Sequence, residues 1–357
     1  MMPASRVPAV VPMADLELAR TDAPAATPGV TIGLVAFNQE DYVREAVRSA
    51  LAQVGPPVEI ILSDDCSSDS TFSIMAEEAR NYRGPHRVRA RREAANVGTV
   101  QHLINVAREA RGDLLVVAAG DDISHPNRAE ALHAAWVETG AAALSSWHDE
   151  IDEDGRLLRG DVSFPSSPFT QKLFADEPQA QRDDGVVPTV PGFCAAYPRA
   201  FWADMPDPPA KLLVEDGLAS ALILLRGETI HRVPESLISY RLLPQSLTVR
   251  SASEREELRR REGKISSSGR ELVDQVDYTL AVARRSGLTL HPRTERWFRR
   301  ARLHGRLTSN FWSASPGNRW ARLLQMRTSY DARFLLPRLL GFGVFERMRR
   351  LVLRRSG

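Results

Sequence analysis

Between Val30 and Ala118 the chain alternates short apolar segments, rich in β-branched residues, with longer segments of helical periodicity. The segment 30–37 (VTIGLVAF) has the length and composition of a buried parallel strand, and the apolar positions that follow up to residue 51 recur as one face of a helix. The pattern repeats, with predicted strands at 58–63, 87–91 and 114–118 and predicted helices at 69–82 and 99–110. Because strands that alternate with helices are joined by right-handed crossovers, the sequence predicts an α/β fold with a mostly parallel sheet flanked by helices.

Acidic and turn-forming residues gather directly after three of the predicted strands. They are the segments 37–40 (FNQE), 64–69 (DDCSSD) and 120–122 (GDD). The carboxyl ends of parallel strands meet at one edge of a sheet, and ligands of such folds bind beyond that edge. We therefore expect the three segments to meet in a functional site.

The first acidic pair, Asp64 and Asp65, allows two interpretations. A carboxylate or hydroxyl after a strand can cap the next helix by accepting its free backbone N–H groups, and Ser68 or Asp69 stands in the right place. Capping needs one such residue, whereas two adjacent acids stand at this strand end. Carboxylates can also accept hydrogen bonds from a nucleobase imide and from ribose hydroxyls, as in dinucleotide-binding folds, and we favour this interpretation of the pair.

The second acidic pair, Asp121 and Asp122, follows Gly120 after a strongly apolar strand. Two neighbouring carboxylates suit a hard divalent cation, which needs only one or two of them when phosphate oxygens and water complete its coordination. The glycine lets the backbone approach a ligand closely. The alternative is a surface turn before a helix that starts near Pro126, so the motif alone is weak evidence for a metal site.

The third acidic pair, Glu215 and Asp216, opens a predicted apolar helix over 214–225. Acids are favoured at a helix N-terminus by the helix dipole, which is the structural interpretation. Two carboxylates close together also repel each other, which raises the pKa of one of them and suits it to act as a general base towards a hydroxyl group. Both interpretations stay open on the sequence alone.

The cysteine content and the hydropathy of the chain indicate in which cellular compartment the protein belongs. The only two cysteines, Cys66 and Cys194, have no ligand-spaced histidines near them, which favours buried thiols in a reducing compartment and hence a cytoplasmic protein. No apolar run approaches the roughly 20 residues needed to cross a bilayer. We expect residues 1–28, rich in Pro and Ala, to be a flexible leader, and residues 147–190 to form a hairpin and a long loop.

The charges are divided unevenly along the chain. Residues 1–250 carry 23 Lys and Arg against 35 Asp and Glu, a net charge of −12, whereas residues 251–357 carry 24 against 10, a net charge of +14. The basic region is predicted to be helical, with arginine runs such as 299–302 and 347–355 interleaved with aromatic residues. Such helices can pack on the acidic part of the chain or lie on an anionic membrane surface. No nucleic-acid-binding motif accompanies the charge, so we expect no nucleic acid partner.

Taken together, these motifs resemble a GT-A fold glycosyltransferase of family 2 over about residues 30–245. The likeness lies in the order and spacing of segments that are unspecific one by one: 30–53, 59–71, 96–98 (NVG), 111–113 (RGD), 120–126 (GDDISHP), 215–216 with 226–227, and 239–241 (SYR). The resemblance implies a Rossmann-like GT-A domain over residues 29–250 between the leader and a basic α-helical region, 251–357. It also implies an inverting, metal-dependent, hexosyltransferase-type enzyme that moves a sugar from a nucleotide-sugar, expected to be UDP-linked, to an acceptor hydroxyl in cell-surface polysaccharide or glycoconjugate biosynthesis.

The resemblance also implies roles for particular residues. Nucleotide contacts fall on Ala36, Phe37, Asn38, Glu40, Asp64, Asp65, Asn96, Gly120 and Asp121. Asp121 is the expected ligand of Mg²⁺ or Mn²⁺, and Asp122 is expected to assist it. Ala119 stands where the family usually has the first acid of its metal-binding motif, so it offers no ligand. The catalytic base falls on Asp216, beside Glu215, and the acceptor pocket on Gly192 and Phe193. A Gln-x-x-Arg-Trp motif of processive members is not found after the acid pair, so one sugar per encounter is expected.

Two other functions are compatible with parts of this pattern. A nucleotidyltransferase that makes a nucleotide-sugar shares the architecture and an acidic metal site, but it is expected to carry an early glycine-rich basic loop where residues 36–40 (AFNQE) stand. A catalytically inactive nucleotide-sugar-binding module is the third candidate, suggested only by Ala119. The expected partners are a nucleotide-sugar donor, a saccharide or lipid-linked saccharide acceptor and, through the basic helices, the inner face of the cell membrane.

Overall fold

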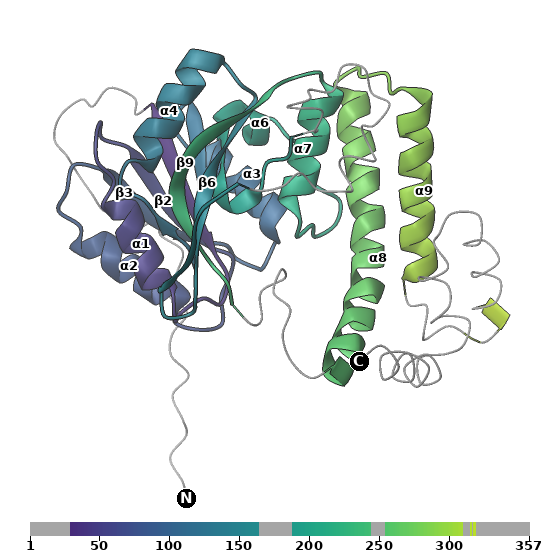
Figure 1. Ribbon diagram of the computed structural model, residues 1–357, viewed down its shortest axis with the longest axis horizontal. Coiled ribbons are helices and arrows are strands. Elements are labelled where there is room, and N and C mark those ends of the chain that lie inside the picture. The colour runs from purple at the N-terminus through teal and green to yellow at the C-terminus, as the bar shows by residue number, and fades with distance from the viewer. Residues whose placement is uncertain (1–28, 164–187, 244–253, 310–314, 316, 319–357) are drawn as a thin grey trace, which may run out of the picture.

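The structure, a computed structural model, describes residues 29–163, 188–243, 254–309, 315, 317 and 318 (Figure 1). The predicted leader at 1–28, most of the loop predicted within 147–190 and the arginine run at 347–355 lie outside the described residues. Among the described helices, none is both long and apolar enough to cross a membrane.

One mixed sheet forms the centre of the part of the molecule that runs from β1 to β9, and α8 and α9 stand beside this part (Figure 1). Its first half is parallel in the order β3-β2-β1-β4, and its second half continues as β8-β6-β9-β5, with β7 paired to β6. The bounds are β1 Val30–Ala36, β2 Glu59–Asp64, β3 Arg87–Arg92, β4 Leu114–Ala119, β5 Ile123–Ser124, β6 Ala143–Ile151, β7 Leu157–Val162, β8 Ala195–Pro198 and β9 Ile230–Arg241. The predicted α/β architecture is confirmed, and the antiparallel pairs β4·β8, β6·β8, β6·β7 and β5·β9 make the sheet mixed.

Helices cover both faces of the sheet and create two hydrophobic cores. On one face lie α1 Val43–Leu51, α2 Thr71–Asn81 and α4 Arg128–Thr139, and on the other lie α3 Thr99–Glu109, α6 Arg199–Ala203 and α7 Glu215–Leu225. The alternation of strand side chains sorts neighbours between the cores: Ile60 and Leu62 of β2 belong to the first, and Ile61 belongs to the second. The strands are apolar along their length because both faces of the sheet are buried, and the helices are apolar at helical spacing because one side of each packs on the sheet.

The helix predicted at 69–82 begins two residues later than expected. Oδ1 of Asp69 accepts the backbone N–H of Thr71 at 3.0 Å, so the aspartate lies outside the helix and satisfies one of its free N–H groups. The hairpin expected after Trp147 is present, but its first strand already begins at Ala143.

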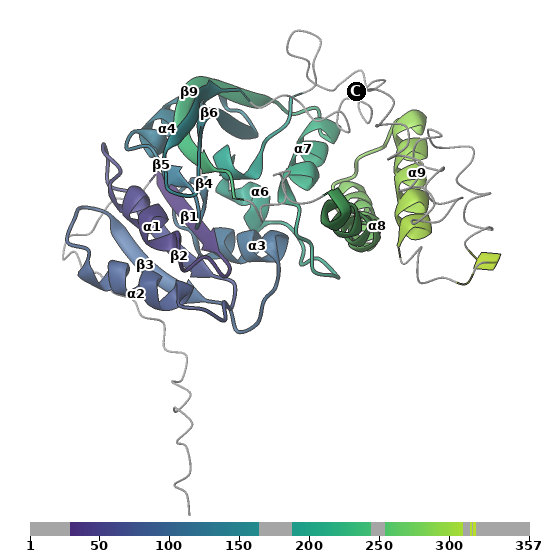
Figure 2. The ribbon, with the colours of Figure 1, turned by 60° about the horizontal axis from the view of Figure 1, so that its bottom comes forward.

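Two long helices follow the sheet, α8 Glu254–Arg285 and α9 Pro292–Thr308 (Figure 2). Side chains of α8, including Val276, Tyr278 and Val282, join the core that α7 covers. A Cβ atom at Gly305 of α9 would stand 2.4 Å from the carbonyl oxygen of Gly269 in α8, so the absence of a side chain permits this close approach of the two helices. In its described part, the basic region therefore packs on the α/β part of the chain.

Candidate active site

The loop after β1 is joined to the loop after β2 through Asn38. Its backbone N–H donates to Oγ of Ser67 at 2.8 Å, and its Oδ1 accepts the backbone N–H of Ser68 at 2.9 Å. Asn38 has a φ of 51°, the left-handed region that asparagine tolerates better than most residues. The sequence predicted nucleotide contact for Asn38, whereas these contacts of its side chain are with the neighbouring loop.

Glu40 makes a second reciprocal pair with the same loop. Its backbone N–H donates to Oδ2 of Asp69 at 3.2 Å, and its Oε2 accepts the backbone N–H of Ser70 at 2.9 Å. These bonds fix the strand ends of β1 and β2 side by side. The polar atoms of Asn38 and Glu40 therefore hold the loop after β1 against the loop after β2.

Asp64, the last residue of β2, and Asp65, the residue after it, lie in different surroundings. Asp64 is fully buried, and its Oδ2 accepts the backbone N–H of Ser67 at 3.0 Å and pairs with Nε of Arg92 at 3.1 Å. Its Oδ1 has no hydrogen-bond partner within the described residues. Asp64 thus closes the turn that begins the loop, and one buried oxygen is left over.

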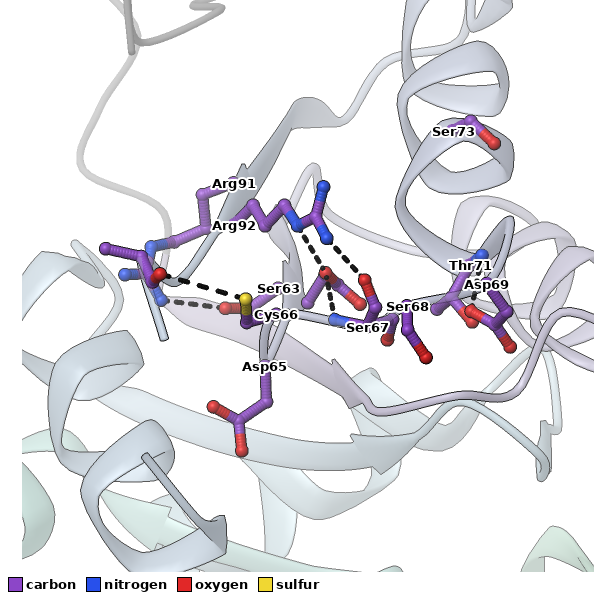
Figure 3. Close-up of polar contacts among 12 residues, drawn as sticks. Ser63, Asp65, Cys66, Ser67, Ser68, Asp69, Thr71, Ser73, Arg91 and Arg92 are labelled. Atoms are coloured by element: carbon purple, nitrogen blue, oxygen red, sulfur yellow. Dashed lines mark hydrogen bonds and ion pairs between the residues drawn. The ribbon is translucent and has the colours of Figure 1, made fainter. Parts of the chain in front are cut away.

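Asp65 is directed away from the Arg92 contacts (Figure 3) and reaches the start of α3. Its Oδ1 accepts the backbone N–H of Val97 at 2.7 Å and its Oδ2 that of Gly98 at 3.0 Å. Burial raises the pKa of Asp65, while these N–H groups and the charge of Lys211 lower it. Asp65 therefore holds the loop that leads into α3, and Gly98, the residue directly before that helix, lies 33 residues away in the sequence. The capping interpretation, made for Ser68 or Asp69, fits Asp69, which accepts the backbone N–H of Thr71.

Lys211 is a residue that the sequence analysis missed. Its ammonium group donates to Oδ1 of Asn96, and the carbonyl of the next residue, Leu212, accepts the backbone N–H of Val100 at 3.2 Å. Lys211 thereby brings a positive charge to the loop that Asp65 holds. Its only sequence signal is a position four residues before the acid pair at 215–216, which is too weak to identify it.

The turn after β4 lies directly against the end of β1. A Cβ atom at Gly120 would stand 2.6 Å from both Cβ of Ala36 and Oε1 of Gln39, so only glycine fits. The side chain of Gln39 hydrogen-bonds to Asp121, whose pKa burial nevertheless raises. The predicted segments 37–40 and 120–122 therefore meet at one edge of the sheet, where Gly120 lies against Gln39.

Asp122 is buried beneath the same turn. Its Oδ1 accepts the backbone N–H of Arg241 at 2.9 Å, and its Oδ2 has no partner in the described part of the chain. Burial and then the charge of Asp121 raise the pKa of Asp122 well above its ordinary value. An unpartnered carboxylate oxygen beside a second carboxylate is a donor set that a divalent cation can use when a ligand's phosphate oxygens join it. Within the described ranges no group of three or more His, Cys, Asp or Glu side chains is placed to hold a metal ion.

The acid pair at 215–216 opens α7, as predicted, and is packed against the short helix η1 (Gly192–Cys194). Oδ1 of Asp216 accepts the backbone N–H of Gly217 at 2.5 Å. Burial, followed by the charge of Asp216, raises the pKa of Glu215 to about 7, and burial also raises the pKa of Asp216. A carboxyl group that titrates near neutrality can exchange protons with a substrate hydroxyl.

A buried tyrosine lies below this acid pair. Tyr197 of β8 has no exposed surface, and its hydroxyl has no partner within the described residues. Burial raises the pKa of Tyr197 well above its ordinary value, and the charges of Glu215 and Asp216 raise it further. Sequence analysis missed Tyr197 because an aromatic residue in an apolar strand is expected in any core.

Arg128 connects the β4 side of the site to the η1 side. This buried guanidinium donates through Nη2 to the carbonyl oxygens of Val117 in β4, at 2.7 Å, and of Phe193 in η1, at 3.0 Å. The ring of Phe193 stacks on Tyr240 of β9, with centroids 4.2 Å apart. Arg128 therefore joins Phe193, a predicted acceptor residue, to β4, the strand that leads into the acid turn at 120–122.

Comparisons with known proteins identify a family and a fold. Residues 31–204 match the model of the family described as glycosyl transferase family 2. The succinoglycan biosynthesis protein ExoO of Rhizobium meliloti is 32% identical over 142 residues, 37% of this chain and 36% of its own length. An uncharacterized protein of Mycobacterium tuberculosis is 29% identical over 170 residues, 42% of this chain and 49% of its own length. The chain thus spans about half the length, or less, of these relatives.

Among solved structures, the mannosyltransferase PcManGT from Pyrobaculum calidifontis, in complex with GDP-Man and Mn²⁺, is similar with a TM-score of 0.51. The likeness covers 92% of this chain and 82% of that chain at 16% sequence identity. At this level of identity the likeness concerns the fold.

Proposed function

Residues 31–204 of this chain are a family 2 glycosyltransferase domain with the GT-A fold, and from this premise we propose that the enzyme is inverting and metal-dependent and transfers a sugar from a UDP-linked donor to an acceptor hydroxyl. The observation that carries the proposal is that Arg128 joins β4, the strand that leads into the acid turn, to η1, whose Gly192 lies against Glu215 of the second acid pair. One acidic centre suits a diphosphate with its cation, and the other suits a hydroxyl that must lose a proton.

The donor nucleotide is proposed to bind at the ends of β1 and β2. Phe37 supports this placement, because 46% of its surface is exposed beyond a strand whose other residues are largely buried, which leaves an aromatic surface for a base. Ala36, Asp65, Asn96 and Gly120 surround the same edge, and Lys211 supplies a positive charge there. Asn38, Glu40 and Asp64 act in this proposal by holding the loops that form the binding surface.

Asp121 and Asp122 are the residues proposed to hold Mg²⁺ or Mn²⁺. They fit such an ion because they offer two adjacent carboxylates with one unpartnered oxygen. When bound, the cation would offset the negative charge that develops on the departing nucleoside diphosphate. Ala119 contributes no ligand, so the coordination relies on these two residues and the donor.

Asp216 is proposed as the general base, with Glu215 as its neighbour. The carboxylate of Asp216 takes the proton of the acceptor hydroxyl while the hydroxyl oxygen attacks the anomeric carbon and the bond from that carbon to the diphosphate breaks. Attack on the face opposite the leaving group inverts the anomeric configuration. Gly192 and Phe193 line the acceptor side, and the enzyme needs no covalent intermediate with a side chain.

The acceptor is proposed to be a saccharide or a lipid-linked saccharide of cell-surface polysaccharide or glycoconjugate assembly. The relative ExoO acts in succinoglycan biosynthesis by its name, which supports this class of product. Leu213 and Val214 are exposed apolar residues directly before the acid pair, which supports an acceptor that carries an apolar group.

The basic region after residue 250 is proposed to bring the catalytic domain, residues 29–250, to the inner face of the cell membrane. On α9, the side chains of Arg296, Arg299, Arg300, Leu303 and Arg306 are exposed, while Phe298 and Ala301 are buried. The spacing of the exposed residues puts them on one helical face, which we call the α9 basic face. Four guanidinium groups around an exposed leucine match the chemistry of an anionic lipid surface.

A screen of nucleotide-sugars tests the donor proposal. A UDP-sugar with Mn²⁺ is expected to raise the midpoint of thermal unfolding by mass action, and the same donor with an acceptor should release UDP. GDP-sugars serve as the matched comparison. If GDP-sugars alone stabilise the protein, the UDP assignment is wrong, and binding without any turnover on a panel of acceptors would favour an inactive binding module.

A further inference from the structure

Arg241 contacts both acids of the turn at 120–122. It is the last residue of β9, and only 2% of its surface is exposed. Its backbone N–H donates to Oδ1 of Asp122 at 2.9 Å, and its Nε donates to the carbonyl oxygen of Asp121, also at 2.9 Å. One residue, far away in the sequence, thus holds the side chain of one acid and the backbone of the other.

The far end of the Arg241 side chain is held by two further elements. Nη1 donates to the carbonyl oxygens of Asp152, at 3.2 Å, and Glu153, at 2.9 Å, in the turn between β6 and β7. Nη2 pairs with Oε2 of Glu45 in α1 at 2.5 Å, and the guanidinium lies 5.1 Å from the ring centre of Tyr42. The acid turn, the β6–β7 turn and α1 therefore meet on one guanidinium group.

These contacts require an arginine. The planar guanidinium donates in several fixed directions at once, whereas a lysine offers one compact ammonium group that cannot reach three separate elements. The group is also positive, and it is packed against a turn that carries the buried carboxylate of Asp122 beside the partly buried Asp121. Its contacts are with protein atoms, so it acts on the reaction through the acids that it holds.

We propose that Arg241 is a positioning residue that fixes the acid turn of Asp121 and Asp122 against the β6–β7 turn and α1, so that these acids are preorganised for a divalent cation and the donor diphosphate. The proposal rests on the function proposed above for this turn. The one held oxygen of Asp122 orients its carboxylate, and the bond to the carbonyl of Asp121 sets the backbone from which the second carboxylate extends. Specificity for the base or the acceptor is not assigned to Arg241.

The test compares Arg241→Lys with Arg91→Lys in the whole chain. Arg91 is the matched control, because it is a largely buried arginine in β3 that bonds to Ser63 and pairs with Glu93 and Glu109, at the other edge of the sheet. UDP binding is measured by calorimetry with Mn²⁺ and with EDTA, and amide hydrogen exchange is measured on the free proteins. Thermal unfolding reports the general loss of stability in both variants.

Arg241→Lys is expected to weaken UDP binding in Mn²⁺ by at least tenfold and to change it less than twofold in EDTA. It should also speed amide exchange at residues 119–124 and 152–156, whereas Arg91→Lys leaves both readouts within twofold of wild type. If Arg241→Lys does not fold, Glu45→Gln replaces it and should weaken binding in Mn²⁺ by two- to fivefold, because it loosens one end of the guanidinium. The proposal is overturned if the Mn²⁺-dependent affinity and the exchange of the turn stay at wild-type values. If wild type itself shows no Mn²⁺-dependent UDP binding, the proposed function fails, and the exchange measurement alone decides whether Arg241 orders the turn.

Discussion

The backbone of Gly192 lies directly against the carboxylate of Glu215. A Cβ atom at position 192 would stand 1.8 Å from Oε1 of Glu215, far inside van der Waals contact. The glycine therefore permits the acid pair at the start of α7 to lie against η1. This contact is where the predicted acceptor loop and the predicted catalytic acids meet.

Gly192→Ala is expected to displace Glu215 and to lower sugar transfer by at least tenfold, measured as UDP release in the presence of acceptor. Gly217→Ala is the control, since its Cβ would meet only Nε2 of Gln275, the end of a flexible side chain, at 3.2 Å. Transfer by Gly192→Ala at the level of the control would show that the position of Glu215 is irrelevant to the reaction.

Asp216→Asn is expected to abolish transfer and to leave nucleotide binding nearly intact. The amide keeps the shape of the side chain but does not take a proton from the acceptor hydroxyl. Single-turnover transfer and calorimetric UDP binding are the two measurements. Transfer within a few-fold of wild type would mean that another group is the base, and the parallel variant Glu215→Gln shows whether that group is Glu215.

Asp121→Ala is expected to weaken UDP binding in Mn²⁺ by at least tenfold, because the cation loses one of its two proposed carboxylates. Binding in EDTA should change little. Asp69→Ala is the comparison, since Asp69 bonds to Glu40 and Thr71 in the loop frame and has no assigned metal role. Equal affinities of wild type and Asp121→Ala, with and without Mn²⁺, would exclude Asp121 as a ligand.

The raised pKa of Glu215 predicts a pH dependence of stability. Burial and the charge of Asp216 raise this pKa from 4.5 to about 7 in the folded state. Between these values the folded protein keeps a proton that the unfolded chain has lost, so this group's stabilisation is complete below about pH 4.5 and is lost as the pH rises through 7. This shift corresponds to a change of at most about 3 kcal/mol in the free energy of unfolding.

Glu215→Gln removes this titration. Relative to wild type, the variant should therefore gain stability between pH 5 and pH 8, measured by chemical denaturation at both values. Glu235→Gln, at an exposed position of β9, is the control and should show no such difference. If the difference in the free energy of unfolding between Glu215→Gln and wild type stayed constant from pH 5 to pH 8, the pKa of Glu215 would not be raised in the folded state.

The α9 basic face predicts binding to anionic vesicles. Wild type should float with phosphatidylglycerol vesicles at low salt and not with phosphatidylcholine vesicles, and Arg296→Glu with Arg300→Glu should lower the bound fraction at least tenfold. Arg80→Glu with Arg83→Glu makes the same charge change at exposed positions near the end of α2. If the bound fraction fell equally in the two double variants, vesicle binding would depend on the net charge of the protein and not on the α9 basic face.

Much of the fold could be predicted because its signals are local. The apolar segments at β1, β2 and β4 and the helical spacing of α1 and α3 reflect burial on both faces of the sheet, so each element is visible within about ten residues of sequence. The position of Asp121 and Asp122 at a strand end was visible for the same reason. The hairpin of β6 and β7 was predicted, but the pairing of β8 with β4 and β6 was not, since it joins segments that are remote in sequence.

The roles of single polar groups depended on distant partners. Asp64 and Asp65 are adjacent in the sequence, yet one closes its own turn with Arg92 and the other holds the start of α3. Asn38 was predicted to contact a nucleotide, which stays a prediction, and the sequence did not indicate that its side chain bonds to Ser68. Hydrogen bonds are short and directional, so a polar side chain can bond only to groups that the fold brings next to it. The sequence shows which side chains can accept hydrogen bonds, and the packing of the loops decides which donors they meet.

The sequence by itself determined the alternation of strands and helices, the three acidic pairs and their order along the chain, because hydrophobic periodicity and strand-end turns are properties of neighbouring residues. Only the tertiary structure decided that Arg241 and Asp122, 119 residues apart, share a hydrogen bond, that Gly192 admits Glu215, and that Lys211 stands beside Asn96. Burial is the physical reason. Polar groups removed from water must find partners, and the compact fold supplies those partners from segments that the linear sequence keeps apart.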